Sequence, residues 1–166
     1  MLGLKKKQDN FDIFASKVCL NKYLDATWSC NLKTPKKEKI PVVQLGGMPR
    51  LKLEYEESEQ TWLCGVVALD KGGWKVIDIN KYKTLNFCYY EESGIGGKVS
   101  FVDKNETQSN EVDLTQVTGV SPAEECQISL ELNQFFNESF EPHNARLFKI
   151  IGVNRPHFYI SNIFLS

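Results

Sequence analysis

The chain has 166 residues, of which 42% are hydrophobic and 25% charged, and its formal net charge is −1. These values are ordinary for one globular domain. A nucleic-acid or anionic-membrane binder normally carries a surplus of Lys and Arg, so the charge balance argues against both classes. No apolar run approaches the roughly 20 residues of a membrane-spanning helix. We therefore expect a single domain over residues 1–166, with residues 1–10 as a flexible lead-in.

The spacing of the five cysteines matches neither a zinc-binding motif nor a disulfide framework. Their number is odd and no two have CxxC spacing, which argues against a zinc ribbon and against a full disulfide framework. Cys64 and Cys88 lie in strand-like runs, where we expect buried, apolar packing. A single disulfide bridge between Cys19 and Cys30 is an alternative that the sequence leaves undecided. The basic N-terminus lacks the apolar segment of a signal peptide, so we expect either an intracellular protein or a module of a longer secreted chain.

Strand signals recur about every ten residues, which is typical of a β-sandwich or barrel. Leu51 and Leu53 alternate with Lys52 and Glu54, so one face of this strand is apolar and the other polar. Several such strands require a core on one side only, as in two antiparallel sheets packed face to face. Strands are expected at 17–21, 26–32, 40–45, 51–56, 61–69, 84–90, 98–103, 112–120, 126–132, 145–153 and 157–165. A short lead-in is expected at 10–16, a strand end or single helical turn at 74–82, a mobile polar loop at 104–111 and an irregular loop at 135–142.

From residue 49 onward, the order of motifs resembles the galactose-binding-like jelly roll of many non-catalytic carbohydrate-binding modules. The segments that carry this likeness are 50–55 with 62–67, the passage from Trp74 to Phe87, and 127–135 with 147–152 and 158–165. Within the second segment, the family pattern of Asp, hydrophobic, Tyr, Leu and Phe is matched by Asp78, Ile79, Tyr82, Leu85 and Phe87. The resemblance implies an all-β, two-sheet antiparallel jelly-roll sandwich that binds a carbohydrate and does not catalyse a reaction.

The resemblance also bears on metal binding. In many relatives the last strand carries an Asp that helps to hold a structural calcium ion, and this chain has Ser161 at that place. A Ser hydroxyl is a poorer ligand than a carboxylate for a hard cation. We therefore expect no cofactor, although a structural calcium ion stays open.

Candidate binding residues come from the strand faces that point away from the core. A sugar is bound by aromatic rings against its C–H faces and by planar polar groups that hydrogen-bond its hydroxyls. Tyr90 is opposite in phase to Leu85, Phe87 and Tyr89, and Arg146 begins a strand on the side opposite Leu147. Trp74 follows a Gly-Gly pair and is either a loop platform or a plug at the sandwich end. The predicted ligand-binding residues are Trp62, Tyr90, Gln127, Ser129, Glu131, His143 and Arg146, each of which also has an ordinary structural interpretation.

The leading hypothesis is binding of a β-glycan, as a polysaccharide or oligosaccharide, on a concave sheet face, with the neighbouring domains of a larger enzyme as further partners. The sequence has no HExxH, GxSxG, P-loop or GxGxxG motif, which argues against an enzyme. A protein-interaction or assembly domain is the alternative, and convergence of Trp62, Tyr90 and Arg146 on one groove would favour glycan binding over it. A small hydrolase would need two converging carboxylates, for which Glu131 and Asp103 are the least implausible pair.

Overall fold

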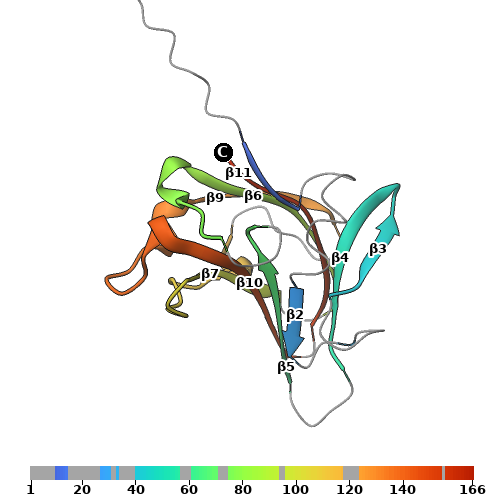
Figure 1. Ribbon diagram of the computed structural model, residues 1–166. Coiled ribbons are helices and arrows are strands. Elements are labelled where there is room, and N and C mark those ends of the chain that lie inside the picture. Colours follow the sequence, from blue (N-terminus) through green and yellow to red (C-terminus); the bar gives the residue numbers. More distant parts are fainter. Residues whose placement is uncertain are drawn as a thin grey trace, which may run out of the picture.

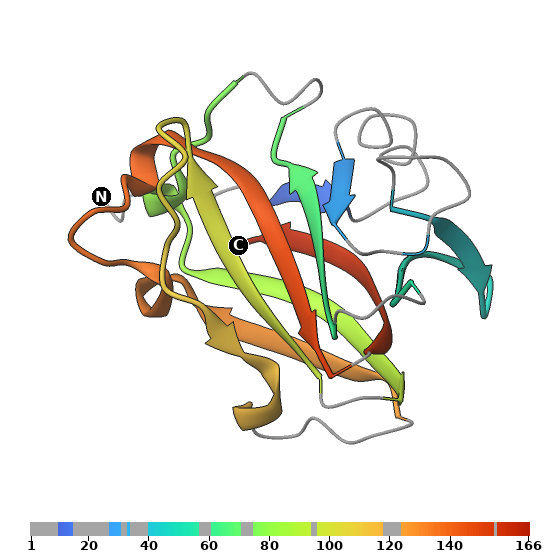
Figure 2. The ribbon, with the colours of Figure 1, turned by 90° about the horizontal axis from the view of Figure 1, so that it is seen from below.

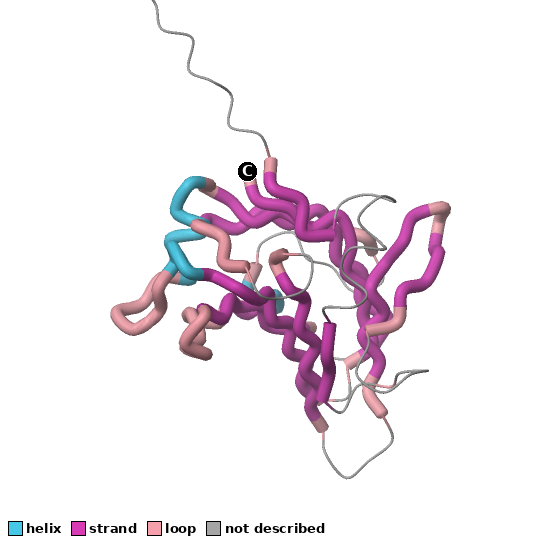
Figure 3. Tube along the Cα trace, in the orientation of Figure 1, coloured by secondary structure: helices cyan, strands magenta, loops and turns pink. Residues whose placement is uncertain are grey.

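The computed structural model describes residues 10–14, 27–30, 33, 40–56, 61–70, 75–93, 96–117, 124–154 and 156–166. The expectations for residues 1–9, for a strand at 17–21, for Cys19 and for Trp74 lie outside these residues. The described strands are β1 (Phe11–Phe14), β2 (Thr27–Cys30), β3 (Val42–Leu45), β4 (Met48–Glu54), β5 (Trp62–Ala68), β6 (Thr84–Ser93), β7 (Gly97–Asp103), β8 (Val112–Asp113), β9 (Cys126–Glu131), β10 (Ala145–Val153) and β11 (His157–Leu165). The described helical parts are short 3₁₀ turns, η2 (Ile79–Lys81), η3 (Leu114–Gln116), η4 (Leu132–Phe135) and η5 (Pro142–Asn144), as Figure 3 shows.

The strands form two antiparallel sheets that pack face to face (Figure 1). Sheet A has the order β3-β4-β11-β6-β9, and sheet B has the order β2-β5-β10-β7-β8. The short strand β1 pairs with the end of β11, beyond the part of β11 that pairs with β4. Seen from below, β7, β10 and β5 pass in front of the strands of sheet A (Figure 2). This arrangement confirms the predicted all-β sandwich.

The path of the chain between the sheets is that of a jelly roll. From β4 to β7 each strand lies in the sheet opposite its predecessor, and the same alternation returns from β9 to β11. Among the described strands, β4 and the two-residue β8 each stay in the same sheet as the strand before them. Apart from the β3–β4 and β7–β8 pairs, strands that are neighbours in a sheet are not consecutive in the chain, as for β11 and β4 or β10 and β5. The fold brings the C-terminal third of the chain into the centre of both sheets.

The core lies between the inner faces of the two sheets. Leu51 and Leu53 of β4 are at most 2% exposed, as the sequence pattern predicted. Phe101 of β7 is fully buried, and its ring centre lies 5.1 Å from that of Phe135 and 5.7 Å from that of Phe148. Aromatic rings at these separations gain interaction energy beyond the burial of their area. The same alternation that buries these residues turns their neighbours outward.

The matched segment from Asp78 to Phe87 has a structural role. The Asp78 side chain accepts a hydrogen bond of 3.2 Å from the Asn80 backbone N–H and so caps the turn η2. Ile79 is fully buried, and Tyr82 packs against the core with its ring 6.2 Å from that of Phe11. The motif therefore directs the chain into the core strand β6.

The cysteine prediction is confirmed for the two residues in core strands, because Cys64 is 7% and Cys88 is 6% exposed. Cys88 faces away from the core between the sheets, since its neighbours Phe87 and Tyr89 point into it. Burial, followed by the nearby Glu125 carboxylate, raises the pKa of the Cys88 thiol above its usual value. The thiol is therefore neutral at pH 7. In the part of the chain that the structure describes, no helix is long and apolar enough to cross a membrane.

Tyr89 provides a test of the core. Its ring packs 5.4 Å from that of Phe158, while its hydroxyl oxygen is buried and makes no hydrogen bond of normal geometry to a described residue. Burial first, and then the Glu91 carboxylate, raise the pKa of Tyr89 well above 10. The unfolded chain therefore loses this proton before the folded chain does. The stability that the neutral phenol provides is complete below about pH 10 and declines as the pH rises further.

Replacing Tyr89 by Phe is expected to leave stability at pH 7 unchanged or to increase it by about 1 kcal/mol, because an unsatisfied polar atom is removed. The variant should also lose less stability between pH 7 and pH values above 10. Urea denaturation at both pH values measures the two effects. A variant that is clearly less stable at pH 7 would show that the hydroxyl has a stabilising partner.

Candidate functional site

Four of the seven predicted binding residues lie on the outer face of sheet A, which is the face turned away from the core. Tyr90 is opposite in phase to its core neighbours on β6, as predicted. On β9, Ile128 and Leu130 point into the core, which turns Gln127, Ser129 and Glu131 outward. The register places Cys88 opposite Gln127, Asn86 opposite Ser129, and Thr84 opposite Glu131. The predicted polar row on β9 therefore lies directly beside the outer row of β6.

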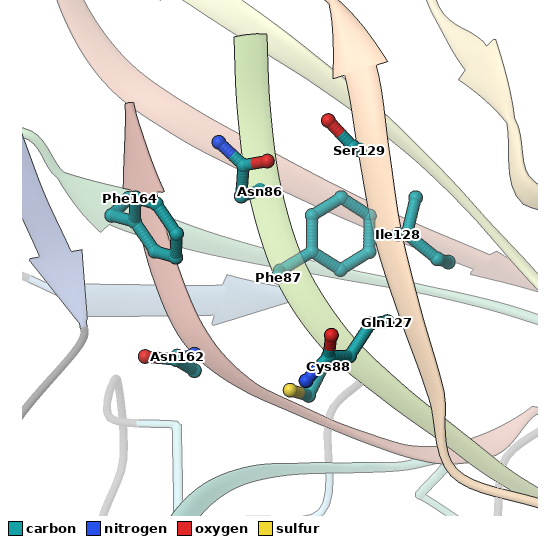
Figure 4. Close-up of a pocket in the computed structure, with 8 residues that line it drawn as sticks. All are labelled: Asn86, Phe87, Cys88, Gln127, Ile128, Ser129, Asn162 and Phe164. Carbon is teal, nitrogen blue, oxygen red and sulfur yellow. The ribbon is translucent and has the colours of Figure 1, made fainter. Parts of the chain in front are cut away.

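A depression of about 350 Å³ lies on this outer face, and we call it the β6–β9 pocket (Figure 4). Residues from three adjacent strands line it, and most of the side chains that face outward are uncharged and polar. Its lining residues are Asn86, Phe87, Cys88, Gln127, Ile128, Ser129, Asn162 and Phe164. Gln127 and Ser129 belong to the predicted set, whereas Asn86, Asn162 and Phe164 do not. Tyr90 and Glu131 lie on the same outer face without lining the pocket.

The β11 side of the pocket is shaped by a bulge. The pairing of β11 with β6 shifts register between Ser161 and Phe164. Within this bulge Asn162 has a φ of +52°, in the left-handed region that few residues other than Gly adopt. Bulges of this kind redirect side chains. The irregularity accounts for both Asn162 and Phe164 lining the pocket, which strict alternation along β11 would not predict.

An ion pair crosses the outer face of sheet A near the pocket. Arg50 of β4 pairs with Glu125, which precedes β9, and its Nε donates 3.2 Å to the Leu45 carbonyl oxygen. Both charges act on the Cys88 thiol at the edge of the pocket. Farther along the face, the rings of Tyr90 and Tyr159 lie 5.9 Å apart. Tyr90 therefore packs against an aromatic neighbour and belongs to a different region of the face from Gln127.

Trp62 lies on the other side of the sandwich, on the outer face of sheet B. Leu63 and Val67 of the same strand are in the main core, so Trp62 points away from it, and Trp62 is 43% exposed. Trp62 and Tyr90 therefore do not form one groove, and the prediction of a single site containing both is wrong. This separation counts against the predicted glycan site in which Trp62 and Tyr90 bind the same ligand. Any sugar site must be assigned to one outer face at a time.

The outer face around Trp62 combines an apolar strip with a polar row, and we call it the Trp62 face. The apolar strip is formed by Cys64, Val66 and Ala68 of β5 with Leu147 of β10, all at most 7% exposed. The register also places Trp28 of β2 opposite Val66. An exposed indole thus stands at one end of a buried apolar strip.

The polar row of the Trp62 face is a connected set of side chains on β7, β10 and the loop after β7. Lys149 Nζ donates 2.6 Å to Gln108 Oε1, and Gln108 Nε2 donates 2.9 Å to Glu111 Oε1. Lys98 Nζ lies 3.5 Å from Glu111 Oε2. Ile151 of β10 pairs with Cys64 on one side and with Lys98 on the other, so Lys98 is level with Cys64. Cys64 is two residues from Trp62 on β5, so the polar row begins one alternation step along the face from Trp62. Sequence reasoning missed these residues because it treated 104–111 as a loop without structure, although the phase of Lys98 and Lys149 could have indicated their face.

The remaining two candidates lie near the start of β10. His143 is exposed in the turn η5, and Arg146 is half-buried at a bulge between Ala145 and Leu147. The Arg146 Nε atom is buried and has no hydrogen-bond partner among the residues that the structure describes. Leu147 belongs to the apolar strip of the Trp62 face and not to the core between the sheets. The alternation used to orient Arg146 relative to Leu147 therefore does not hold across this bulge.

Of the two carboxylates considered for a hydrolase, Glu131 and Asp103, Asp103 has a structural role. Asp103 is fully buried, and its Oδ1 accepts backbone hydrogen bonds of 2.8 Å from Asn105 and 3.0 Å from Thr107. Its Oδ2 accepts a third, of 3.1 Å, from the Glu141 N–H. Asp103 thus organises two loops, whereas Glu131 is exposed on the outer face of sheet A. Among the described residues, no group of three or more His, Cys, Asp or Glu side chains could hold a metal ion.

The topology and the two outer faces define the class of this domain, which is a jelly-roll β-sandwich with the fold of carbohydrate-binding modules. A solved family 30 carbohydrate-binding module matches it with a TM-score of 0.77 and 19% identity, over 96% of this chain and 88% of that one. The family 30 module of a cellulosomal cellulase of Clostridium thermocellum matches with a TM-score of 0.75 and 20% identity, over 95% and 97%. A family 29 module variant complexed with cellulohexaose matches with a TM-score of 0.55 and 14% identity, over 95% and 90%. No protein-family model and no curated protein matches the chain.

Proposed function

We propose that this domain binds a carbohydrate without catalysing a reaction, and that the Trp62 face is the binding surface. The observation that carries the proposal is the 43% exposure of the Trp62 side chain at the end of an apolar strip. A ligand that covered this ring would remove apolar surface from water. The flat ring of Trp62 is suited to contact with the C–H face of a pyranose.

The polar row beside Trp62 supplies the second half of sugar recognition. Gln108 offers an amide, Glu111 a carboxylate, and Lys98 and Lys149 offer ammonium donors. These side chains hold one another in place, so less conformational entropy is lost when a ligand binds. Each hydrogen bond to a sugar hydroxyl would contribute a net of roughly 0.5–1.5 kcal/mol. We therefore expect modest affinity that depends strongly on the aromatic contact.

A β-glycan chain is the proposed ligand class. An outer face with an exposed aromatic side chain and a polar row that begins one alternation step along the face from it suits several consecutive sugar units. The similarity in fold to a module solved with cellulohexaose supports a β-linked glucan as the first candidate. The similarity to a module of a cellulosomal cellulase supports a role beside the other domains of a larger enzyme.

Isothermal titration calorimetry against cellohexaose, soluble xylan, soluble mannan and a mixed-linkage glucan tests this proposal. We expect binding to at least one of these glycans. Replacing Trp62 by Ala should weaken it by at least about tenfold, equivalent to roughly 1.4 kcal/mol. Trp62→Phe should retain part of the affinity, because a flat ring remains.

Met48→Ala is the matched control, since Met48 is similarly exposed at 39% but lies in sheet A. This control should bind as the unchanged protein does. No binding across the four glycans, or equal binding by the Trp62→Ala variant, would contradict the proposal.

The alternative is a protein-interaction or assembly domain, for which the same exposed Trp62 is the supporting observation. An exposed apolar side chain on a sheet face also suits a protein partner. Sedimentation analysis of the unchanged protein and of the Trp62→Ala variant separates the two. An oligomer that dissociates in the variant, together with silence in the glycan titrations, would favour assembly.

A further inference from the structure

We propose that the β6–β9 pocket is a second ligand site, on the opposite side of the sandwich from the Trp62 face, and that it accepts one ring of a neutral sugar. This site does not depend on the Trp62 face. Its basis is the 350 Å³ depression, whose lining contributes amide groups from three strands, a hydroxyl from β9 and an aromatic ring from β11. Sites for small molecules have volumes of about 300–1,000 Å³, so the pocket suits a small ligand.

The electrostatic character of the pocket favours a neutral ligand. None of its lining side chains is charged, since Cys88 is the one ionisable member and its pKa is raised. The charges that border the pocket, Arg50 and Glu125, neutralise each other in an ion pair. An anion or a cation would therefore meet no opposite charge in the pocket to offset its loss of hydration.

The amide groups are placed to recognise hydroxyls. Asn86 Nδ2 donates 3.0 Å to Thr84 Oγ1 and 2.9 Å to Ser166 Oγ. These two bonds use both donor hydrogens and fix the amide plane, so that Asn86 Oδ1 is presented as an acceptor on the side of Ser129 (Figure 4). The pocket therefore contains one acceptor whose direction is set before any ligand arrives.

Two further polar side chains of the pocket, Gln127 and Ser129, are available to a ligand. Gln127 and Ser129 are exposed, and their side chains make no hydrogen bond within the part of the chain that the structure describes. Gln127 supplies two donors and an acceptor, and the Ser129 hydroxyl can donate or accept. A sugar ring carries hydroxyls that both donate and accept, which matches this mixed set.

The β11 side of the pocket adds an apolar surface and a rigid backbone. The half-buried ring of Phe164 stands on this side, across from Asn86 and Ser129 (Figure 4). The left-handed conformation of Asn162 holds the bulge that brings Asn162 and Phe164 to the pocket. An aromatic ring facing fixed amides is the combination that one pyranose ring requires.

The experiment uses the methyl β-glycosides of glucose, galactose, mannose and xylose as probes. Each is titrated into the ¹⁵N-labelled protein while the side-chain amide signals of Asn86, Gln127 and Asn162 are followed by NMR. We expect saturable shifts of these signals with at least one glycoside. Ser129→Tyr, which fills the pocket from an exposed strand position, should abolish them.

Glu131→Tyr is the matched control, because Glu131 is exposed on the same strand and face but does not line the pocket. This variant and Trp62→Ala should both retain the shifts. The site is refuted if none of the four glycosides moves the amide signals, if the shifts persist in Ser129→Tyr, or if they vanish in Trp62→Ala. The glycan titrations with Trp62→Ala test the Trp62 face, whereas the amide shifts test the β6–β9 pocket. A negative result for one site is therefore distinguishable from a negative result for the other.

Discussion

Replacing Phe101 by Ala is expected to lower the free energy of unfolding by about 3–5 kcal/mol, because the substitution empties a fully enclosed site. The Phe101 ring is in contact with Phe135 and Phe148, at ring-centre distances of 5.1 and 5.7 Å. Phe148 lies on the adjacent strand β10 and Phe135 in the turn η4. The ring therefore joins sheet B to the segment that follows β9 of sheet A.

Chemical denaturation with urea measures this loss. Lys98→Ala on the same strand is the control, since Lys98 is partly exposed and its ion pair with Glu111 should contribute less than about 1 kcal/mol. A loss below 1 kcal/mol for Phe101→Ala would mean that the sheets do not pack around this ring. If Phe101→Ala does not fold, Phe101→Leu gives a smaller cavity and a measurable value.

Replacing Gly152 by Ala is expected to destabilise the fold by about 2–3 kcal/mol through overpacking. A Cβ atom at this position would overlap Pro156 Cγ, lie 2.9 Å from Pro156 Cβ and lie 3.0 Å from Phe158 Cε1. The register pairs Gly152 with Gly97, where a Cβ atom would lie 2.9 Å from the Ile151 carbonyl oxygen. The glycine pair thus provides the space that the Phe158 ring and the β10–β11 connection occupy.

A double-mutant cycle identifies the cause of this effect. Pro156→Ala removes the closest overlapping atom, so the cost of Gly152→Ala should be smaller in the Pro156→Ala background than in the unchanged protein. Thermal or urea unfolding of the four proteins gives the coupling energy. Additive losses would place the cost of Gly152→Ala elsewhere, for example in the backbone of β10.

Much of the fold follows from alternation along single strands. Leu51 and Leu53, and likewise Phe87 and Tyr89, were predicted to share a face, and all four are buried. Period-2 alternation is a local property, so it can be detected without knowing which strands are neighbours. The strand boundaries deviate by a few residues, and the predicted strand at 112–120 begins as the two-residue β8 followed by the turn η3.

The location of the candidate site could not be predicted in the same way. Alternation separates the core side of a strand from its outer side, but it does not say to which sheet the strand belongs. Trp62 and Tyr90 both point away from the core, yet β5 and β6 lie in opposite sheets. Most strands that follow one another in a jelly-roll chain lie in opposite sheets. Outward-facing residues on two such strands, which look equivalent in sequence, therefore lie on opposite surfaces of the molecule.

Bulges limited the site prediction further. The register shifts in β10 near Arg146 and in β11 between Ser161 and Phe164 break the alternation on which face assignments depend. The sequence gives little warning of either bulge, because neither contains a Gly. Asn162 and Phe164 line the β6–β9 pocket, and Leu147 joins the apolar strip of the Trp62 face, for this reason.

Mapping the binding of cellohexaose by NMR on the ¹⁵N-labelled protein shows which outer face of the sandwich binds the glycan. We predict that the largest shifts occur at the Trp62 indole N–H and on the outer face of sheet B, including the side-chain amide of Gln108. Shifts confined to the outer face of sheet A, around Tyr90 and Gln127, would contradict it. The absence of any shift with cellohexaose, xylan or mannan fragments would equally contradict carbohydrate binding by the Trp62 face.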